Sequence, residues 1–171
     1  KEAYDNKEWV KFIINYLLLT FQTRNEDLNV LITKNKKDVN EKDNFILLHK
    51  SSCVFIRNNY KTVEIYKPKE DVIRNKKLIV ALHTLLGDKE KDWLLKTDGE
   101  HIIPTELNRA VSNQTYDKIG STKYFKILST VKRNIEKMSD NRGTNPDTIV
   151  HSYKMDKKIN LKKKVKLVVV D

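Results

Sequence analysis

Residues 6–21 read NKEWVKFIINYLLLTF and predict the helix on which the fold depends. Apolar residues recur in this run at spacings of three and four, with further apolar residues between them, so the helix is apolar on several sides. Such a helix lies either at the centre of a core or against a partner. Lys11 and Asn15 interrupt the run, which is also shorter than the roughly 20 apolar residues that cross a bilayer. We therefore expect no membrane partner.

Short runs of strand character follow this helix and are separated by polar turn segments. These runs are Leu28–Thr33, Phe45–His49, Cys53–Arg57 and Thr62–Tyr66. The last two predict a hairpin that turns at residues 57–60, because asparagine tolerates the positive φ of tight turns. Pro68 ends the series. Residues 1–70 are thus predicted to form an N-terminal helix plus a small antiparallel sheet.

Residues 71–171 are predicted to form a mostly helical, basic part that makes one compact unit with the first. The spacing of leucine and isoleucine indicates a helix over Lys76–Leu86, which Gly87 ends, and a second short helix over Asp88–Leu95. Further helices are expected over Pro104–Val111, from Ser121 to Met138, and over Pro146–Met155 behind a cap at Asn145. The alternating residues 162–170 predict a final strand. The fold class is therefore α+β.

The composition excludes several kinds of site. Cys53 is the single cysteine and lies in an apolar run, which indicates a buried thiol and rules out a cysteine-based zinc site within one chain. A reducing, intracellular compartment fits best, either cytoplasmic or nucleoid and nuclear. The four glycines are scattered and form no phosphate-binding loop. We therefore expect no cofactor and no metal.

The net charge of +11 is unevenly distributed. From Ser121 onward the chain has thirteen Lys or Arg and five Asp or Glu, while the first 120 residues have a net charge of only +3. Basic surfaces bind polyanions because binding releases condensed counterions, which favours nucleic acid as the partner. Two alternatives remain open: a solvated face in a lysine-rich composition, or contact with an acidic protein or membrane surface.

Residues 93–136 have the most specific pattern. The predicted order is a short helix, a turn at Asp98-Gly99, a helix from Pro104, a polar connection over Ser112–Gly120 and a long basic helix. The leucine pair Leu94-Leu95, followed by Asp-Gly and Pro-x-Glu-Leu, resembles the opening of winged-helix domains. The resemblance implies a helix-turn-helix whose third helix enters the major groove. The long polar connection departs from a tight turn, and three ordinary packed helices would give the same pattern.

Under this interpretation the basic third helix faces nucleic acid. Its inward stripe is predicted to be Tyr124, Phe125, Leu128, Val131 and Ile135. The predicted contact residues are Ser121, Thr122, Lys123, Lys126, Thr130 and Arg133, together with Arg142, Lys162, Lys163 and Lys164. Tyr116, Tyr124, Phe125 and Tyr153 interleave with the basic residues, and only those that are exposed could stack on bases. We also expect Trp9, Phe12, Ile13, Leu17, Phe125, Leu128 and Val131 to be largely buried.

The run His101-Ile102-Ile103-Pro104 resembles the His-Ile-Val-Pro run of HNH nucleases, with Glu100 as the preceding acidic residue. The resemblance implies His101 as a general base beside a divalent metal, with Asn108 or Asn113 and His151 completing the site. The ββα-metal hairpin needs a strand pair before its helix, however. In addition, the 38 residues from Asn113 to His151 exceed the usual spacing of metal ligands.

The sequence thus predicts a non-enzymatic nucleic-acid-binding domain, for DNA ahead of RNA, from a phage, viral or bacterial replication, regulation or defence protein. The second hypothesis is a protein-interaction or structural domain, or a homodimer, whose charge is compositional and which exposes an apolar patch. The third is a metal-dependent nuclease of HNH type.

Overall fold

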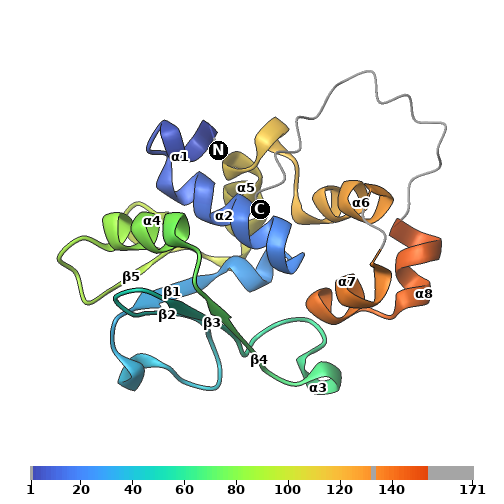
Figure 1. The fold of residues 1–171 in the computed structure, drawn as a ribbon, viewed down its shortest axis with the longest axis horizontal. Helices are drawn as coiled ribbons and strands as arrows, with labels where there is room; N and C mark the ends of the chain where they lie inside the picture. Colours follow the sequence, from blue (N-terminus) through green and yellow to red (C-terminus); the bar gives the residue numbers. More distant parts are fainter. Residues whose placement is uncertain (1, 132–133, 154–171) are drawn as a thin grey trace.

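The computed structural model describes residues 2–131 and 134–153 of the 171-residue chain. Within these residues the fold is α+β, with eight α-helices, a five-stranded mixed sheet and a separate two-stranded hairpin. The strand order of the large sheet is β4-β3-β2-β1-β5, and α1, α2, α4 and α5 lie on one side of it (Figure 1). No helix in the described ranges has the length and apolar character needed to cross a membrane.

Helix α2 (Trp9–Phe21) is the centre of the core. Ile13, Ile14 and Leu17 have no solvent-exposed surface. Besides α1, the helix contacts α4 (Lys76–Leu86), α5 (Pro104–Gln114), α6 (Ser121–Val131) and α7 (Ile135–Arg142). The chain itself therefore covers the several apolar sides that the sequence predicts for this helix. The short helix α1 (Glu2–Asp5) precedes it and packs Tyr4 edge-on against Trp9.

The sheet is mixed, whereas the sequence predicts an antiparallel one. The strands are β1 (Val30–Thr33), β2 (Asn44–Leu48), β3 (Cys53–Arg57), β4 (Lys69–Ile73) and β5 (Lys91–Trp93). β1 and β2 pair in parallel, and every other neighbouring pair in this sheet is antiparallel. The cause is the segment 34–43, which returns the chain to the start of β2 instead of making a hairpin turn. This crossover contains the 3-10 turn η2 (Lys36–Asp38).

The two faces of the sheet are covered differently. The inner face, with Ile32, Ile46 and Phe55, belongs to the main core beneath α2 and α4. The outer face has Phe45, Leu47 and Ile56, which form a small second cluster. Val39 of the crossover packs against this cluster, so the crossover shields part of the outer face.

The predicted strand Thr62–Tyr66 is wrong. Residues 63–66 form the short helix α3 (Val63–Tyr66), and the partner of β3 is β4, which begins after Pro68. The buried Tyr60 explains the difference, because its hydroxyl donates a hydrogen bond of 2.5 Å to the carbonyl of Lys67 and closes the connection into a compact loop. The hydrogen bond between Tyr60 and Lys67 therefore outweighs the strand preference of residues 62–66.

The predicted helix Asp88–Leu95 is also wrong. α4 ends at Leu86 with Gly87 as its C-cap, as predicted, but residues 91–93 then form β5 against β1. β6 (Lys96–Thr97) and β7 (Glu100–His101) follow as a separate hairpin. The first helix of the predicted three-helix pattern is therefore a strand.

The single long helix predicted from Ser121 is two helices. α6 ends at Val131, and α7 begins behind Asn134, whose side chain accepts a hydrogen bond from the backbone N–H of Lys137. Val131, which we expected to be buried, is 50% exposed at the end of α6. Ile13, Leu17, Phe125 and Leu128 are buried as predicted, and Trp9 and Phe12 are partly buried.

The chain after α7 follows the prediction as far as it is described. α8 (Pro146–Thr148) begins behind Asn145, whose side chain accepts a hydrogen bond from the N–H of Asp147, and η4 (Ile149–Tyr153) continues it. The predicted strand 162–170 lies outside the described residues.

Cys53 lies in the main core with no exposed surface, and burial raises the pKa of its thiol from 9.0 to about 12. At pH 8 its thiolate fraction is then on the order of 1,000-fold below that of an ordinary thiol. We expect the native chain to resist a disulfide reagent such as dithionitrobenzoate, and the urea-unfolded chain to release one equivalent of chromophore promptly. Equal reaction rates in the two states would contradict this burial.

Candidate nucleic-acid interface

Helix α6 turns its apolar side inward and its polar side outward. Tyr124, Phe125 and Leu128 are buried, in agreement with the predicted inward stripe. On the other side Thr122, Lys123 and Thr130 are exposed, and Lys126 is half-exposed. Four of the predicted contact residues therefore share one accessible face.

The start of α6 is held in place by α2 and by the turn that follows α2. The backbone N–H of Ser121 donates to the side-chain oxygen of Asn25 over 3.2 Å. The hydroxyl of Tyr124 donates to Asn15 in α2 over 3.4 Å, and burial raises the pKa of Tyr124 to about 12. Ser121 itself is buried, so it positions the helix and does not belong to the accessible face.

Arg142 is in the core and is not at the surface where the sequence analysis placed it. Only 2% of the residue is exposed, and Nη1 donates to the carbonyls of Gln22 and Thr23. The guanidinium carbon lies 4.1 Å from the ring centre of Phe125, and desolvation lowers the pKa of Arg142. We therefore leave Arg142 out of the candidate interface.

The last turn of α7 is bound by donors from the first half of the chain. A helix leaves its final carbonyls without partners inside the helix, and their partial negative charge attracts cations. The carbonyls of residues 140–143, here called the α7 carbonyl end, receive four such donors. Lys69 donates to Asp140, Arg57 to Asn141 over 2.8 Å, Arg24 to Arg142 over 2.7 Å, and Thr62 to Gly143 over 2.8 Å.

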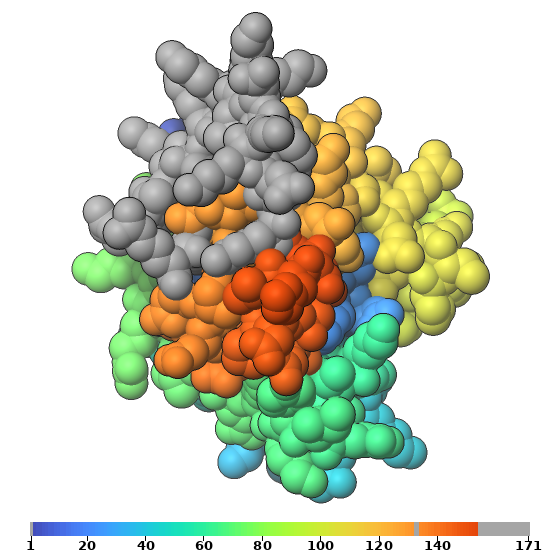
Figure 2. Space-filling model, turned by 90° about the vertical axis from the view of Figure 1, so that its right-hand side faces the viewer, coloured from blue at the N-terminus to red at the C-terminus, as the bar shows by residue number. Residues whose placement is uncertain are grey.

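These contacts dock the C-terminal helices on the segment around α3 and β4, and we call this contact between the α7 carbonyl end and its donors the junction. Figure 2 shows the residues of α7, α8 and η4, in orange and red, lying directly on the green residues around α3. Desolvation and the neighbouring Arg57 lower the pKa of Lys69, in keeping with a cation drawn into this junction. Three of the basic side chains in the first half therefore serve packing and are not available to a polyanion.

A buried carboxylate completes this junction. Asp27 is almost fully buried and accepts a hydrogen bond from the backbone N–H of Arg24 over 3.0 Å. Burial raises the pKa of Asp27, against the opposing influence of the cations Arg57, Arg24 and Arg142. The carboxylate therefore offsets part of the positive charge that the arginines bring into the core.

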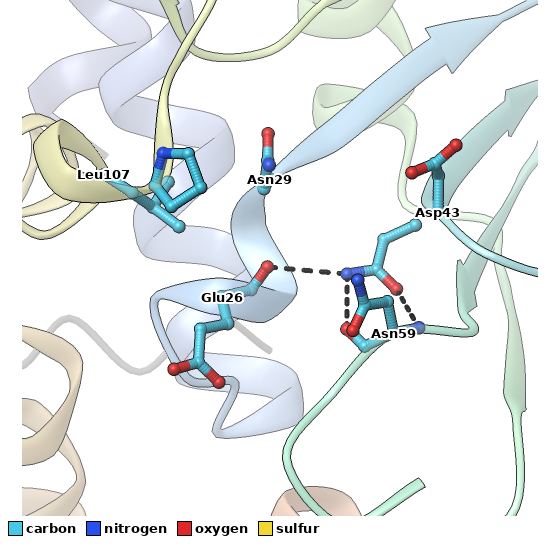
Figure 3. A pocket seen from close by; sticks show the side chains of 7 residues that line it. Glu26, Asn29, Asp43, Asn59 and Leu107 are labelled. Atoms are coloured by element: carbon cyan, nitrogen blue, oxygen red, sulfur yellow. Dashed lines mark hydrogen bonds between the residues drawn. The ribbon is translucent and has the colours of Figure 1, made fainter.

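An open pocket of about 180 Å³ lies where the chain enters β1 and β2. Asn29, Asp43 and Asn59 approach it from neighbouring strand ends, with Leu107 of α5 on the opposite wall (Figure 3). Asn44 is fixed beneath it, since its side-chain amide donates to the carbonyl of Asn59 over 2.8 Å. Glu26 and Asp43 contribute two carboxylates and no basic side chain lines the pocket, so its charge does not suit a phosphate.

His101 lies on β7 beside this pocket. Its ring stacks on Trp93 with centroids 3.7 Å apart, and Nε2 lies 2.9 Å from the side-chain oxygen of Asn29. A strand pair, β6 and β7, does precede helix α5 here. Across residues 2–131 and 134–153, no group of three or more His, Cys, Asp and Glu side chains is arranged to hold a metal ion.

The remaining predicted contact residues, Arg133 and Lys162–Lys164, lie outside the described residues. Two basic residues that were not predicted from the sequence lie near Tyr116: Lys11 is 5.4 Å from the ring centre, and Lys118 ends the short turn η3 (Tyr116–Lys118) before α6. Lys11 could not be selected from sequence, because only the packing of α2 brings it there. Comparison with family models, curated proteins and solved structures finds no match to this chain.

Proposed function

We propose that this chain binds nucleic acid, DNA ahead of RNA, through the outward face of α6. The observation that carries the proposal is the accessible group Thr122, Lys123, Lys126 and Thr130 on one side of a packed helix. Between Asp117 and Glu136 the sequence has five basic residues and no acidic one. The described lysines of this stretch, Lys118, Lys123 and Lys126, can attract phosphates with no carboxylate between them in the sequence.

The winged-helix resemblance suggests how α6 would lie on DNA. α2 packs against both α5 and α6, and the proposal assigns to it the supporting role that the sequence pattern gave to residues 88–95. α6 would then be the recognition helix, with Thr122 and Lys123 toward its groove-entering end. A role in replication, regulation or defence, inside a bacterial cell or one infected by a phage or virus, suits a domain of this kind.

The first test removes two lysines from the proposed face. We expect Lys123→Ala/Lys126→Ala to weaken binding to a fluorescent 20-base-pair duplex several-fold and to lower the slope of log K against log salt by about 2. The melting temperature should hardly change, because exposed lysines contribute little to stability. Fluorescence anisotropy between 50 and 200 mM salt, together with circular dichroism melting, measures both effects.

A matched control removes two exposed lysines elsewhere. Lys36 and Lys37 belong to η2, in the loop beneath the sheet and far from α6 in Figure 1. We expect Lys36→Ala/Lys37→Ala to change net charge equally and affinity little. If the α6 variant binds as tightly as the parent chain, or the control loses as much, the assignment to α6 is wrong.

A protein-interaction role remains the second candidate, because two apolar side chains are exposed near one sheet edge. Val72 on β4 is 58% exposed and Ile65 on α3 is 74% exposed. Val72 pairs with the half-buried Val54 on the outer face of the sheet. If the parent chain binds no DNA at low salt, this surface becomes the better candidate.

A further inference from the structure

The connection between α5 and α6 has a firmly held base. We call residues 115–120 the Tyr116 loop. Before it, the carbonyl of Gln114 accepts a hydrogen bond of 2.8 Å from Asn15 in α2. The buried hydroxyl of Thr115 bonds to the carbonyls of both Ser112 and Ile119, over 2.9 and 2.6 Å. These bonds join the two ends of the loop to each other and to the core.

The tip of the loop is exposed and its backbone is strained. Tyr116, Asp117 and Lys118 all reach solvent. Asp117 has φ of 60° and Lys118 has φ of 50°, so two successive residues with side chains adopt the left-handed conformation. This conformation carries an energetic cost for L-amino acids and concentrates at functional sites. The clamped base keeps the tip in one position despite this cost.

Of the four aromatic residues that interleave with the basic residues, Tyr116 is the exposed one, and Tyr153 is half-buried. Tyr116 is 37% exposed, whereas Tyr124 and Phe125 on α6 are buried. Lys11 Nζ lies 5.4 Å from the centre of the Tyr116 ring, and Lys118 is two residues away. An exposed ring with a lysine beside it can stack on a base.

The ring also lies close to the proposed α6 face. Ser121 is the fifth residue after Tyr116, so their Cα atoms are at most about 18 Å apart. A duplex held on α6 could therefore place its end beside the loop. Base faces inside a duplex are covered by neighbouring base pairs, whereas the first unpaired base offers a free face to an aromatic ring.

We propose that Tyr116 stacks on an unpaired base, so that the ligand class is a duplex with a single-stranded extension, held by α6 on the duplex side. Lys118 neutralises a phosphate of the extension, and Lys11 does the same by giving up its exposed ion pair of 3.1 Å with Glu8. This inference rests on the proposed function. It adds to it the place where the duplex ends and the single-stranded extension begins. Asp117 at the tip limits the positive charge there. Stacking on the Tyr116 ring should therefore contribute more to the affinity for the extension than the charges of the loop do.

The test compares two fluorescent probes, a 20-base-pair duplex and the same duplex with a ten-nucleotide thymidine extension. In the parent chain and in Tyr116→Phe, we expect the extension to increase affinity about five-fold or more. In Tyr116→Ala this gain should disappear, while affinity for the plain duplex stays within two-fold of the parent value. Tyr116→Leu fills similar space without an aromatic face and should also lose the gain, which guards against a local defect in Tyr116→Ala.

The outcomes separate this inference from the proposed function. If Lys123→Ala/Lys126→Ala weakens both probes but Tyr116→Ala keeps the gain from the extension, the stacking role is wrong and the α6 role stands. If Tyr116→Phe loses the gain as fully as Tyr116→Ala, the hydroxyl is responsible and stacking is overturned. If the parent chain binds neither probe at 50 mM salt, both proposals fail.

Discussion

Replacing Arg57 by methionine should lower the free energy of unfolding by about 1–3 kcal/mol. Arg57 is 2% exposed and donates to Asn141 at the α7 carbonyl end and to Asp71 on β4, each over 2.8 Å. Methionine replaces the apolar stem but leaves both acceptors without this donor. Asp71 and Asn141 are only partly buried, so water recovers part of the loss. Urea unfolding followed by far-UV circular dichroism measures the loss.

The control is an ion pair of the same length at the surface. Lys91 and Asp38 also approach to 2.8 Å, but the Lys91 side chain is 54% exposed, against 3% for that of Arg57. We expect Lys91→Ala to cost less than about 1 kcal/mol, because water replaces the interaction. Burial is then the variable that separates the two substitutions. A loss below 1 kcal/mol for Arg57→Met would show that the junction contributes little to stability.

A methyl group at residue 143 should destabilise the same junction from the other side. Gly143 is the left-handed C-cap of α7 with φ of 61°, a conformation that costs alanine about 1–2 kcal/mol. An added Cβ would lie 2.7 Å from Thr62 Oγ1, 3.1 Å from the Tyr60 ring and 3.3 Å from the Tyr66 ring. Thr62 Oγ1 is itself bonded to the Gly143 carbonyl, so moving away would break that bond. The total loss for Gly143→Ala should reach about 2–5 kcal/mol.

Gly99→Ala is the matched substitution without crowding. Gly99 also has positive φ, at 84°, but an added Cβ meets no atom within 4 Å. We expect it to cost only the backbone contribution of about 1–2 kcal/mol. Thermal and urea unfolding of both variants give the comparison. If both substitutions lower the free energy of unfolding equally, the residues around α3 move away from the added methyl group at no cost in stability.

Local signals were sufficient for the elements whose partners are close in the chain. The ladder of residues 9–21, the apolar runs that became β1, β2 and β3, and the caps at Gly87 and Asn145 were all predicted correctly. β5 was not predicted, because Lys91–Trp93 becomes a strand only by pairing with β1, far earlier in the sequence. The parallel pairing of β1 and β2 was missed because its crossover is a loop and not a helix.

The part of the candidate interface that follows from helix periodicity alone was predicted correctly. The outward position of Thr122 and Lys123 follows from the buried ladder of α6. The role of Arg142 could not be predicted, because its burial depends on the carbonyls of Gln22 and Thr23, which only the folded chain brings near. The charge of a side chain is visible in sequence, but its exposure depends on tertiary packing.

The α7 carbonyl end has a consequence for how the chain is made. Its donors Arg24, Arg57, Thr62 and Lys69 are all translated before their acceptors, and 84 residues separate Arg57 from Asn141. At about 5–20 residues per second, the ribosome takes roughly 4–17 s to add that interval. During this time the carbonyl partners of Arg24, Arg57 and Lys69 in α7 do not yet exist, although Arg57 can already pair with Asp71. We therefore expect the docking of α7 to be a late step in the folding of the chain.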